Sequence, residues 1–523
     1  MSLLGIDVGT TGCKAALFSL DGRVLASAYA EYDIVHPQPG YAELDARRVW
    51  ESVQGVIRRV VSASGQDPVQ ALAVSSLGEA MVPVSEERQV LGPSILNFDC
   101  RGEEYLSSLR ERLSDEQLYR INGNTWGNHY SLTKLKWLQE HEPALYERTD
   151  RFLLWGSFVS FMLGAEPAVD YSLANRTLLF DLERGTWSEE LLSLAGLEGG
   201  KLPTPVPSGT VIGTVAKAPA EELGLPPGTA IVSGAHDQCA NAVGCGVIEE
   251  GRAVFGMGTF LCITPVFRQC RDPACMIERG LNTEHHAAPG RYVSFLYNQG
   301  GSLVKWYRDT FAAQEQREAE REGRELYPDL FAELSPGPSP VIVLPHFTTT
   351  GPPSFIADSC GVIVGLHLET RRGDILKGIL EGTTFYLKEC VDALPPTGIE
   401  IREFRAVGGG SKSELWVQLC ADILGRPMVR PLVTEAGTLG AAIIAGVGAG
   451  IFSSFEEGVE QMVRLERRFE PDPRRHAAYV RRFEDYRSLW PLMAPYLRKV
   501  ASGRRPEALQ EDRPEARTTS EQE

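Results

Sequence analysis

The chain has 523 residues. At roughly 150 residues per domain, this length predicts about three to four domains, or fewer if they are large α/β units. Its 52 basic and 69 acidic residues give a net charge of −17, so it lacks the positive field that attracts nucleic acid or an anionic membrane. We expect neither partner, although a phosphate site made of backbone amides is compatible with this charge. Hydrophobic residues make up 43% and charged residues 23% of the chain, which is typical of a soluble folded protein.

Targeting and metal-binding signals are weak. The first residues contain no basic segment followed by an apolar core, so we expect no secretory signal and a cytoplasmic location. The longest apolar run, residues 439–452, has 14 residues, fewer than the ~20 that span a bilayer. The ten cysteines are scattered and contain no C-x-x-C motif. Reduced thiols are therefore favoured over disulfides or a metal cluster.

The N-terminal region predicts strands followed by a helix. Three apolar segments separated by turn residues, with a hairpin signal at Asp21-Gly22, predict a meander of strands: residues 3–8, 13–20 and 23–32. Asp45 is expected to cap a helix whose apolar positions follow the helical period. A further strand is predicted at residues 71–74. This mixture of elements predicts an α/β fold.

A second region repeats the first pattern. Residues 253–257 and 260–267 predict two strands around the turn Gly258-Thr259, which lies 249 residues after Gly9-Thr10. Such an echo is expected from two similar domains that face a shared cleft. Later segments predict three helices: 374–394, 413–423 and 439–450. We divide the chain into an N-terminal domain, a C-terminal domain and a charged tail predicted to be disordered: residues 1–247, 248–500 and 501–523.

The first candidate site is the turn after the first strand, Asp7-Val-Gly9-Thr10-Thr11-Gly12-Cys-Lys14. Its backbone N–H groups and hydroxyls could bind phosphate oxygens, with Lys14 adding positive charge. Asp7 would hold Mg²⁺ through water molecules. An ordinary hairpin with a solvated aspartate is an equally good interpretation of these residues alone. The motifs G-x-x-x-x-G-K-[ST], G-x-G-x-x-G, H-R-D and D-F-G are all absent, so any nucleotide here binds in another way.

Two later segments add candidate chemistry. An apolar strand ends at Gly234-Ala-His236-Asp237-Gln238, where Asp237 could accept the proton of a hydroxyl that attacks a γ-phosphate. His236 is more easily explained as a structural residue than as a second acid or base. The segment Val407-Gly408-Gly409-Gly410-Ser411-Lys412-Ser413 precedes a predicted helix, so it could admit a flat nucleotide base or serve as a plain glycine-rich connection.

In this order, these segments resemble the FGGY carbohydrate kinases, which belong to the superfamily of actin and hexokinase. The likeness runs from about Leu3 to Ala449 and includes further segments: Pro39-Gly40-Tyr41-Ala42-Glu43, Ser94 to Arg101, Lys134 to Leu138, Asp170 to Ala174, Gly300 to Trp306, Leu380-Glu381-Gly382 and Glu435 to Ala442. The resemblance implies an α/β protein with two ribonuclease-H-like domains flanking a central cleft. It also implies a cleft that closes over ATP and a sugar.

The resemblance also implies roles for individual residues. Asp237 matches the catalytic base and Asp7 the carboxylate associated with Mg²⁺. ATP would be bound by two phosphate loops, an adenosine motif and nearby residues: Gly9, Thr10, Thr11, Lys14, Gly258, Thr259, Gly301, Lys305, Gly409, Gly410 and Ser413. The sugar would be bound by four residues: Glu79, His129, Asp237 and Gln238.

The substrate is less well determined. Where glycerol kinases carry Arg-Glu and xylulose kinases Gln-Met-His-Gly, this chain has Leu77-Gly78-Glu79-Ala80. The arginine is thus missing, yet Glu79 could still accept hydrogen bonds from two sugar hydroxyls. The layout lies nearer the xylulose-kinase branch, so a ketopentose such as xylulose or a related polyol is expected. The rival hypothesis is a non-catalytic nucleotide switch or chaperone-like ATPase of the same superfamily.

Other features stay open at this stage. The hydroxyl that is phosphorylated, any allosteric regulation and the oligomeric state are not encoded in an interpretable segment, and a homodimer is one option. Asn282-Thr283-Glu284-His285-His286 predicts a polar surface loop more readily than a ligand or metal site.

Overall fold

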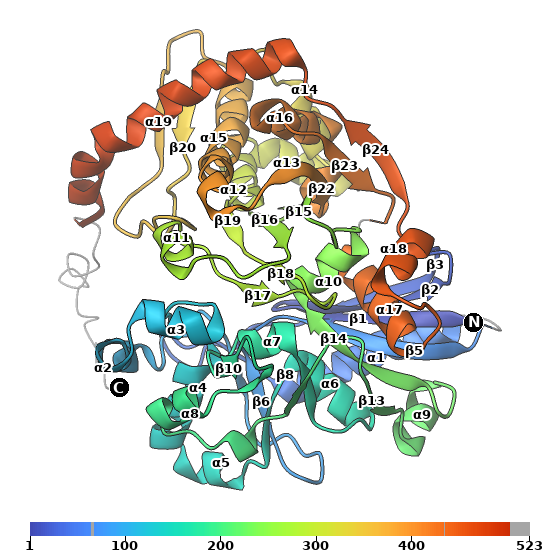
Figure 1. Cartoon of the computed structure of the whole chain (residues 1–523). Coiled ribbons are helices and arrows are strands. Elements are labelled where there is room, and N and C mark those ends of the chain that lie inside the picture. Colours follow the sequence, from blue (N-terminus) through green and yellow to red (C-terminus); the bar gives the residue numbers. More distant parts are fainter. Residues whose placement is uncertain (64–66, 434, 503–523) are drawn as a thin grey trace, which may run out of the picture.

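The computed structural model describes residues 1–63, 67–433 and 435–502 of the chain. It has two lobes, one above the other in Figure 1, and each is built around a mixed β-sheet with helices. The lower lobe contains most of the N-terminal half and the upper lobe most of the C-terminal half. Within the described ranges, no helix combines the length and the apolar character that a membrane crossing requires.

The sheet of the lower lobe has six strands. Their spatial order is β13 (Val211–Thr214), β14 (Ala230–His236), β5 (Val69–Ser76), β1 (Ser2–Val8), β2 (Gly12–Ser19) and β3 (Val24–Glu31). β14, β5 and β1 are parallel, whereas β1, β2 and β3 form an antiparallel meander. β1 and β5 are buried along nearly their whole length, which explains their continuous apolar sequence.

The sheet of the upper lobe has eight strands. Their order is β17 (Glu284–His285), β18 (Tyr292–Val293), β16 (Phe260–Phe267), β15 (Gly251–Met257), β22 (Ile401–Val407), β23 (Met428–Pro431) and β24 (Leu465–Phe469), with β19 (Leu296–Gln299) also paired to β16. β15 is antiparallel to β16 and parallel to β22, as β1 is antiparallel to β2 and parallel to β5. The two sheets therefore share one plan, and the turns at Gly9-Thr10 and Gly258-Thr259 occupy equivalent places in it.

Helices cover the faces of both sheets. The lower lobe contains α1 (Ala46–Ala63), α2 (Leu106–Arg112), α3 (Asp115–Asn122), α4 (Ser131–His141), α5 (Pro143–Arg148), α6 (Trp155–Leu163), α7 (Tyr171–Asn175), α8 (Glu189–Ala195), α9 (Lys217–Leu223) and α10 (Asp237–Gly244). The upper lobe contains α11 (Pro273–Glu278), α12 (Gly301–Phe311), α13 (Ala313–Glu322), α14 (Tyr327–Ala332), α15 (Arg372–Asp392), α16 (Glu414–Leu424) and α19 (Pro473–Ser502).

Short strand pairs complete the architecture: β4 (Glu43–Leu44) with β7 (Ser94–Ile95), β6 (Met81–Val84) with β8 (Arg151–Leu154), β9 (Ala168–Asp170) with β12 (Thr204–Val206), β10 (Phe180–Asp181) with β11 (Thr186–Trp187), and β20 (Ile342–Leu344) with β21 (Val362–Val364).

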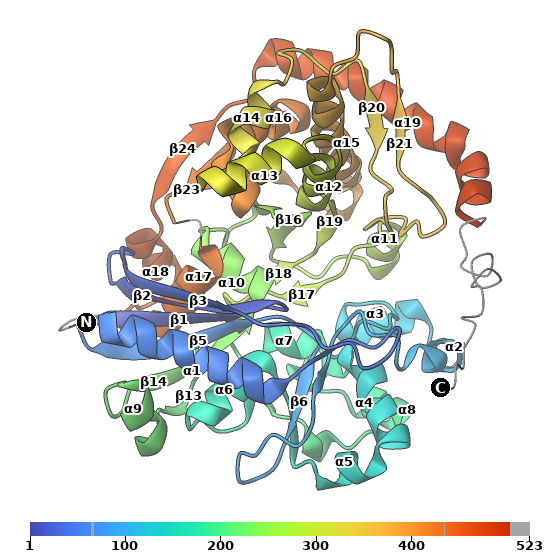
Figure 2. The ribbon, with the colours of Figure 1, turned by 180° about the vertical axis from the view of Figure 1, so that it is seen from behind.

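Two helices from late in the sequence return to the lower lobe. α17 (Ala436–Gly448) packs on β1, β5 and β14, and α18 (Phe455–Met462) packs on α17. α1 covers the opposite face of the same sheet (Figure 2). Leu4 shares a buried cluster with the apolar face of α1, whereas its neighbour Leu3 shares one with α17 and with Val254 of the upper sheet. The cluster that contains Leu3, residues of α17 and Val254 therefore connects the two lobes.

Most predicted elements are confirmed. The N-terminal strands and the turn at Asp21-Gly22 appear within about two residues of their expected bounds, and Asp45 Oδ1 accepts hydrogen bonds from the amides of Arg47 and Arg48 at the start of α1. The last predicted helix begins earlier, at Ala436. All ten cysteines are free thiols. α19 continues to Ser502, and the rest of the predicted tail lies outside the described residues.

The contact between α10 and α17 gives a stability prediction. A Cβ atom at Gly440 would overlap the carbonyl oxygen of Ala240, because the two helix backbones touch at this point. Gly440→Ala should therefore lower the free energy of unfolding by about 1–3 kcal/mol, measured by urea or thermal unfolding. The control is Gly55→Ala in α1, where no atom lies within 4 Å of the added methyl. The control should raise stability by about 0.5–1 kcal/mol. Equal stability of the Gly440 variant and the wild type would contradict this helix contact.

Candidate active site

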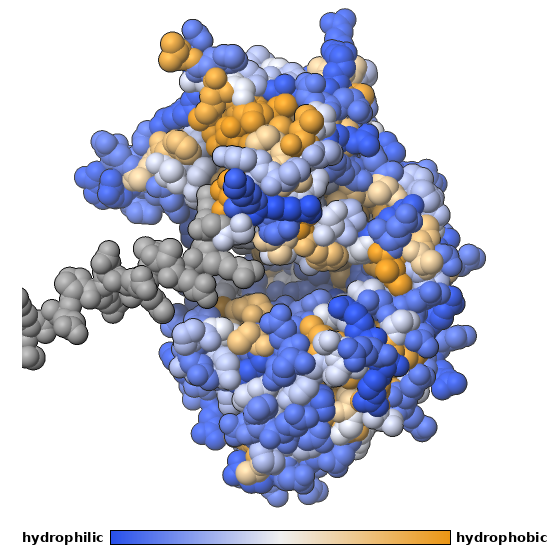
Figure 3. Space-filling view, turned by 90° about the vertical axis from the view of Figure 1, so that its left-hand side faces the viewer, coloured by the Kyte–Doolittle hydropathy of each residue, from blue (hydrophilic) through white to orange (hydrophobic). Residues whose placement is uncertain are grey.

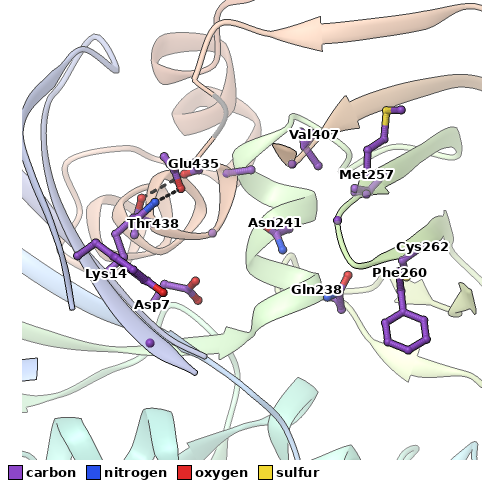
Figure 4. Close-up of a pocket in the computed structure, with 18 residues that line it drawn as sticks. Asp7, Lys14, Gln238, Asn241, Met257, Phe260, Cys262, Val407, Glu435 and Thr438 are labelled. Carbon is purple, nitrogen blue, oxygen red and sulfur yellow. Dashed lines mark hydrogen bonds and ion pairs between the residues drawn. The ribbon is translucent and has the colours of Figure 1, made fainter. Parts of the chain in front are cut away.

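A pocket of about 450 Å³ lies where the two lobes meet. Figure 3 shows the hollow between the lobes from the side, and Figure 4 shows the residues that line the pocket. Asp7 and Lys14 lie on one wall, Met257 and Phe260 on the other, and Gln238 on α10 between them (Figure 4). The complete lining is Asp7, Gly12, Lys14, Tyr29, Gln238, Asn241, Val254, Gly256, Met257, Gly258, Phe260, Cys262, Val407, Gly408, Glu435, Ala436, Gly437 and Thr438.

Asp7 lies near the end of β1, opposite Lys14 of β2. Ser75 Oγ donates a hydrogen bond of 2.6 Å to Asp7 Oδ1, and no described residue donates to Oδ2. Burial raises the pKa of Asp7, while the Ser75 hydroxyl and Lys14 act in the opposite direction. Lys14 forms an ion pair with Glu435. In this arrangement the positive charge of Lys14 is therefore balanced by a carboxylate at the pocket wall.

The first predicted phosphate loop is a tight turn. The Gly9 amide donates to Gly12 O at 2.9 Å, and Tyr32 Oη donates to Gly9 O at 2.7 Å. These bonds hold the backbone of the turn in place. Gly12 lines the pocket, whereas Gly9, Thr10 and Thr11 lie in the adjoining turn and are not among the lining residues.

The second loop, Gly258-Thr259, connects β15 to β16 and is held by the start of α12. The Gly301 amide donates to Gly258 O at 3.0 Å, and a Cβ atom at Gly301 would collide with the same carbonyl group. The structure thus brings Gly258, Thr259 and Gly301 together, and Gly258 lines the pocket. Lys305 lies on α12 with an exposed side chain and is not a lining residue.

The glycine-rich segment Gly408–Gly410 approaches the same pocket. Gly408 has a φ of 87°, and an added Cβ atom would lie 3.0 Å from the carbonyl oxygen of Met257. Gly408 lines the pocket, while Gly409 and Gly410 begin the following turn. Ser413 caps α16 by accepting a hydrogen bond from the Trp416 amide.

The N-terminus of α17 forms a wall that sequence reasoning did not assign. Ala436, Gly437 and Thr438 line the pocket, and a Cβ atom at Gly437 would lie 3.3 Å from Asp7 Cγ. The free amides and dipole of a helix N-terminus attract anions such as phosphate. In the sequence, this segment contributes only to the family resemblance. Its composition does not indicate which sheet the helix packs on.

Asp237 is the first residue of α10, at the end of β14. Burial raises its pKa to about 7, and the negative charges of Asp7 and Glu79 add to this effect. Its side chain retains 31% exposure. His236 Nε2 lies 3.1 Å from Asp237 Oδ1, but Oδ1 accepts no hydrogen bond of acceptable geometry from the described residues. Asp237 therefore has one carboxylate oxygen without a hydrogen bond, and its pKa responds to the charge of Asp7 as well as to that of Glu79.

Glu79 is held differently from our expectation. Its backbone has a φ of 63° in the turn after β5, and its carboxylate is buried against Arg176. Arg176 Nε donates to Glu79 Oε1 at 2.7 Å, and Arg176 Nη1 donates to Glu284 Oε1 at 2.6 Å. Part of the hydrogen-bonding capacity predicted for a sugar is therefore used by an arginine. Glu79 Oε2 accepts nothing from the described residues.

Arg176 follows α7 and was not predicted as a site residue. A Cβ atom at Gly78 would lie 3.1 Å from Arg176 Cγ, so the glycine leaves the space that the arginine occupies. The guanidinium group also lies over the rings of Tyr130 and Phe295 at 5.2 and 5.8 Å. The sequence shows that position 78 is not an arginine. It does not show that Arg176, about 100 residues later, occupies the space beside Gly78.

His129 lies beside the Arg176 cluster and remains accessible to the cleft. Its ring packs on Tyr130 with centroids 3.9 Å apart. The surrounding protein, followed by the charges of Arg176 and Lys134, lowers its pKa. His129 is therefore uncharged at neutral pH and could exchange neutral hydrogen bonds with a ligand.

The surface loop predicted at residues 282–286 is wrong. Thr283, Glu284 and His286 are buried, and the strand β17 binds the lower lobe through a hydrogen bond from the His285 amide to Asn175 Oδ1. His286 is held by Val247 O and the Ala288 amide. The polar sequence of this segment does not predict its burial, because Thr283 and Glu284 find their hydrogen-bond partners, Tyr119 and Arg176, in the opposite lobe.

Comparison with known proteins identifies the family. The profile described as "FGGY family of carbohydrate kinases, N-terminal domain" matches residues 2–244, and the corresponding C-terminal profile matches residues 266–449. The chain belongs to the FGGY family of carbohydrate kinases. It is therefore an ATP-dependent phosphotransferase with an α/β fold of two ribonuclease-H-like domains.

Individual FGGY relatives cover nearly the whole chain. The "Autoinducer-2 kinase" of Escherichia coli (strain K12) is 31% identical in an alignment 518 positions long that covers 93% of this chain and 93% of that protein. The crystal structure of xylulose kinase from Rhodospirillum rubrum has a TM-score of 0.84 and 27% identity, and covers 95% of this chain and 100% of that one. The crystal structure of gluconate kinase from Lactobacillus acidophilus has the same TM-score at 23% identity and covers 95% and 99%, which shows a shared fold.

The raised pKa of Asp237 gives a prediction for this FGGY kinase without any ligand. A carboxyl group that binds its proton more tightly in the folded state destabilises the protein as pH rises from about 4 to about 7. Asp237→Asn should therefore raise the free energy of unfolding above pH 7, by about 1–3 kcal/mol. The gain should disappear towards pH 4. Thermal unfolding across this pH range provides the measurement.

Asp33→Asn is the matched control for that experiment. Asp33 is exposed and makes no hydrogen bond or ion pair with a described residue, so its replacement should leave the pH profile unchanged. A stability gain at Asp237 that stayed constant from pH 4 to pH 8 would show that the carboxyl group is not perturbed in the folded protein.

Proposed function

We propose that the protein transfers the γ-phosphoryl group of MgATP to a hydroxyl of a small sugar, with a ketopentose such as xylulose or a related polyol as the first candidate. The observation that carries this proposal is the position of Asp237, whose Oδ1 accepts no hydrogen bond from the described residues and whose pKa is raised by the charges of both Asp7 and Glu79 as well as by burial. A base placed between a phosphate pocket and a group of buried polar side chains is suited to activate an alcohol beside a phosphate.

Asp237 would orient the attacking hydroxyl and accept its proton. The role suits an aspartate whose pKa lies close to neutral, because such a carboxyl group is ionised in part at pH 7 and is a stronger base than an ordinary aspartate. Gln238, the next residue of α10, lines the nucleotide-side pocket. The start of α10 would therefore contact both substrates.

The triphosphate would lie in the pocket between the lobes. The first-turn amides of α17, the backbone of the two glycine turns and Lys14 supply donors and positive charge there. Lys14 would exchange its partner Glu435 for a phosphate oxygen on binding. The adenosine would extend towards Gly408 to Gly410, where the backbone is open.

The donor set at Asp7 fits a magnesium ion. Its Oδ2 is free of protein donors, and the described residues contain no group of three or more His, Cys, Asp or Glu side chains that could hold a metal by themselves. Mg²⁺ typically binds one or two carboxylates and completes its shell with water and phosphate oxygens. Asp7 would hold the ion, and the bound ion would neutralise part of the phosphate charge.

The sugar would lie on the far side of Asp237, near Glu79, Arg176 and His129. Arg176 lies there over the rings of Tyr130 and Phe295, which add apolar surface. Approach of the two lobes would exclude water, which otherwise competes with the sugar as the phosphate acceptor.

A second candidate substrate comes from the curated relatives, which are named as autoinducer-2 kinases and match 93% of the chain. Autoinducer-2 therefore belongs in any substrate panel next to ketopentoses. The alternative of a non-catalytic nucleotide switch has no support among the relatives described above, all of which are named as kinases.

The proposal predicts ADP release that depends on a sugar. A coupled assay over ketoses, aldoses, polyols and autoinducer-2, with MgATP, should yield at least one compound that raises ADP release about 100-fold or more over the rate with water alone. ADP release that no compound of the panel stimulates would contradict a sugar-kinase function.

Replacement of Asp237 should separate catalysis from nucleotide binding. Asp237→Ala should lower kcat by about 10²–10⁴-fold or more and leave the Kd for ATP within about threefold, because the carboxylate contacts the hydroxyl rather than the nucleotide. Asp33→Ala is the exposed control. For the wild type, kcat/KM should fall about tenfold per pH unit well below pH 7, as Asp237 takes up its proton. Loss of ATP affinity with preserved kcat would place the base elsewhere.

A further inference from the structure

The cluster Glu79–Arg176–Glu284 joins three distant parts of the chain at the proposed sugar site. Glu79 follows β5, Arg176 follows α7, and Glu284 belongs to β17 of the upper sheet. The side chains of Arg176, Glu79 and Glu284 are 12%, 5% and 0% exposed. Asn282 Nδ2 also donates to Glu284 Oε1 at 2.6 Å. The cluster is therefore a buried ionic group with a fixed geometry.

The cluster has an excess of negative charge. Each of the three guanidinium nitrogens of Arg176 already contacts a carboxylate, with Nε and Nη2 on Glu79 and Nη1 on Glu284. Two carboxylates thus share one cation. Asp237 lies close enough for the charge of Glu79 to raise its pKa, and it supplies no positive charge to the cluster.

Neighbouring groups do not offset this excess. The pKa of His236 is lowered by burial, and that of the more exposed His129 by the surrounding protein and the charges of Arg176 and Lys134, so the two imidazoles are neutral. The next two cations, Lys134 and Arg101, lie in a separate group with two carboxylates: Arg101 pairs with Asp99 and Glu43, and Lys134 Nζ donates to the carbonyl oxygens of residues 99 and 101. That group is balanced within itself.

The second carboxylate oxygens of Glu79 and Glu284 accept no hydrogen bond from the described residues. Both protein contacts of Glu79 and of Glu284 involve Oε1, and no described residue donates to either Oε2 atom. Carboxylate oxygens accept hydrogen bonds and cannot donate them. Glu284 Oε2 is fully buried, whereas Glu79 Oε2 is not among the fully buried atoms. The ligand that suits Glu79 Oε2 carries hydroxyl donors and no negative charge of its own.

We propose that the Glu79–Arg176–Glu284 cluster makes the kinase selective for uncharged polyhydroxylated substrates and excludes sugar acids, with Arg176 acting as a specificity-determining residue. The inference rests on the proposed function and names the substrate class of the same site. The fold alone does not determine whether the substrate is neutral or acidic, since a protein named as a gluconate kinase has the same fold. In this chain, the buried charges of the cluster determine the preference.

Arg176 alone would favour the opposite preference, because a guanidinium group is the usual partner of a carboxylate. Its two protein partners remove that option. A sugar carboxylate brought next to Glu79 and Glu284 would meet two like charges in a site with little water, where repulsion is screened weakly. A hydroxyl of a neutral sugar meets only acceptors.

The test compares matched neutral and anionic compounds. The best neutral substrate of the panel is assayed beside the aldonate with the same carbon skeleton, by ADP release with MgATP. Binding of xylulose and xylonate is also measured by calorimetry without ATP. We expect kcat/KM for the neutral compound to exceed that for the aldonate by about 100-fold or more, and neutral xylulose to bind more tightly than xylonate.

Glu284→Gln is the decisive variant. The amide keeps an acceptor for Arg176 and Asn282, so the geometry of the cluster is retained, while its charge changes from −1 to zero. The preference for the neutral compound should fall at least about tenfold, mainly through a lower KM or Kd for the aldonate. Glu278→Gln, an exposed carboxylate that pairs with Arg279 on α11, is the control and should leave the preference unchanged.

The results distinguish a failure of the proposed charge selectivity from a failure of the proposed kinase function. Equal use or binding of the aldonate by the wild type, or an unchanged preference in Glu284→Gln, would overturn the role of the cluster while leaving the kinase function intact. If no compound of either charge stimulates ADP release but xylulose still binds more tightly than xylonate, and the Glu284→Gln variant loses that difference, the proposed function fails and the charge selectivity stands.

Discussion

Several carboxylates lie in one cleft that contains few cations, and the rest of the site depends on this constraint. Asp7, Glu79, Asp237 and Glu284 all lie near the junction of the two lobes, and the nearby cations are Arg176 and Lys14. Burial raises the pKa of Asp237 to about 7, with the charges of Asp7 and Glu79 adding to the effect, and Arg176 is shared by two carboxylates. Both features suit the proposed reaction, in which an alcohol is deprotonated near a polyphosphate.

The second organising feature is the path of the chain after the upper sheet. α17 comes from residues beyond position 435, yet it packs on β1 and α10 of the lower lobe and brings its N-terminal amides to the wall beside Asp7. Glycines at Gly5, Gly244 and Gly440 permit this approach, because side chains there would collide with the neighbouring backbone. The pocket between the lobes is thus assembled from both ends of the sequence, and its shape depends on close backbone packing.

The strand β17 links the lobes on the other side of the cleft. Glu284 reaches Arg176, and Thr283 Oγ1 lies 2.8 Å from Tyr119 Oη of α3. The upper lobe therefore contributes directly to the proposed sugar site as well as to the nucleotide pocket. In the proposed reaction, relative movement of the lobes would alter both sites at once, and this coupling is consistent with a kinase that excludes water when both substrates are bound.

Local features of this protein could be predicted from its sequence because they depend on neighbouring residues. The meander of β1 to β3, the turn at Asp21-Gly22, the cap at Asp45 and the family resemblance through Asp7 and Asp237 all arise from short segments whose geometry is set by hydrophobic period and turn chemistry. The tertiary structure decided what depends on contacts between distant segments. It placed Arg176 in the space beside Gly78, buried Glu284 against the opposite lobe and brought the start of α17 to the pocket beside Asp7. A charge pair or helix contact across 100 residues or more leaves no local pattern, because its energy exists only after the chain has folded.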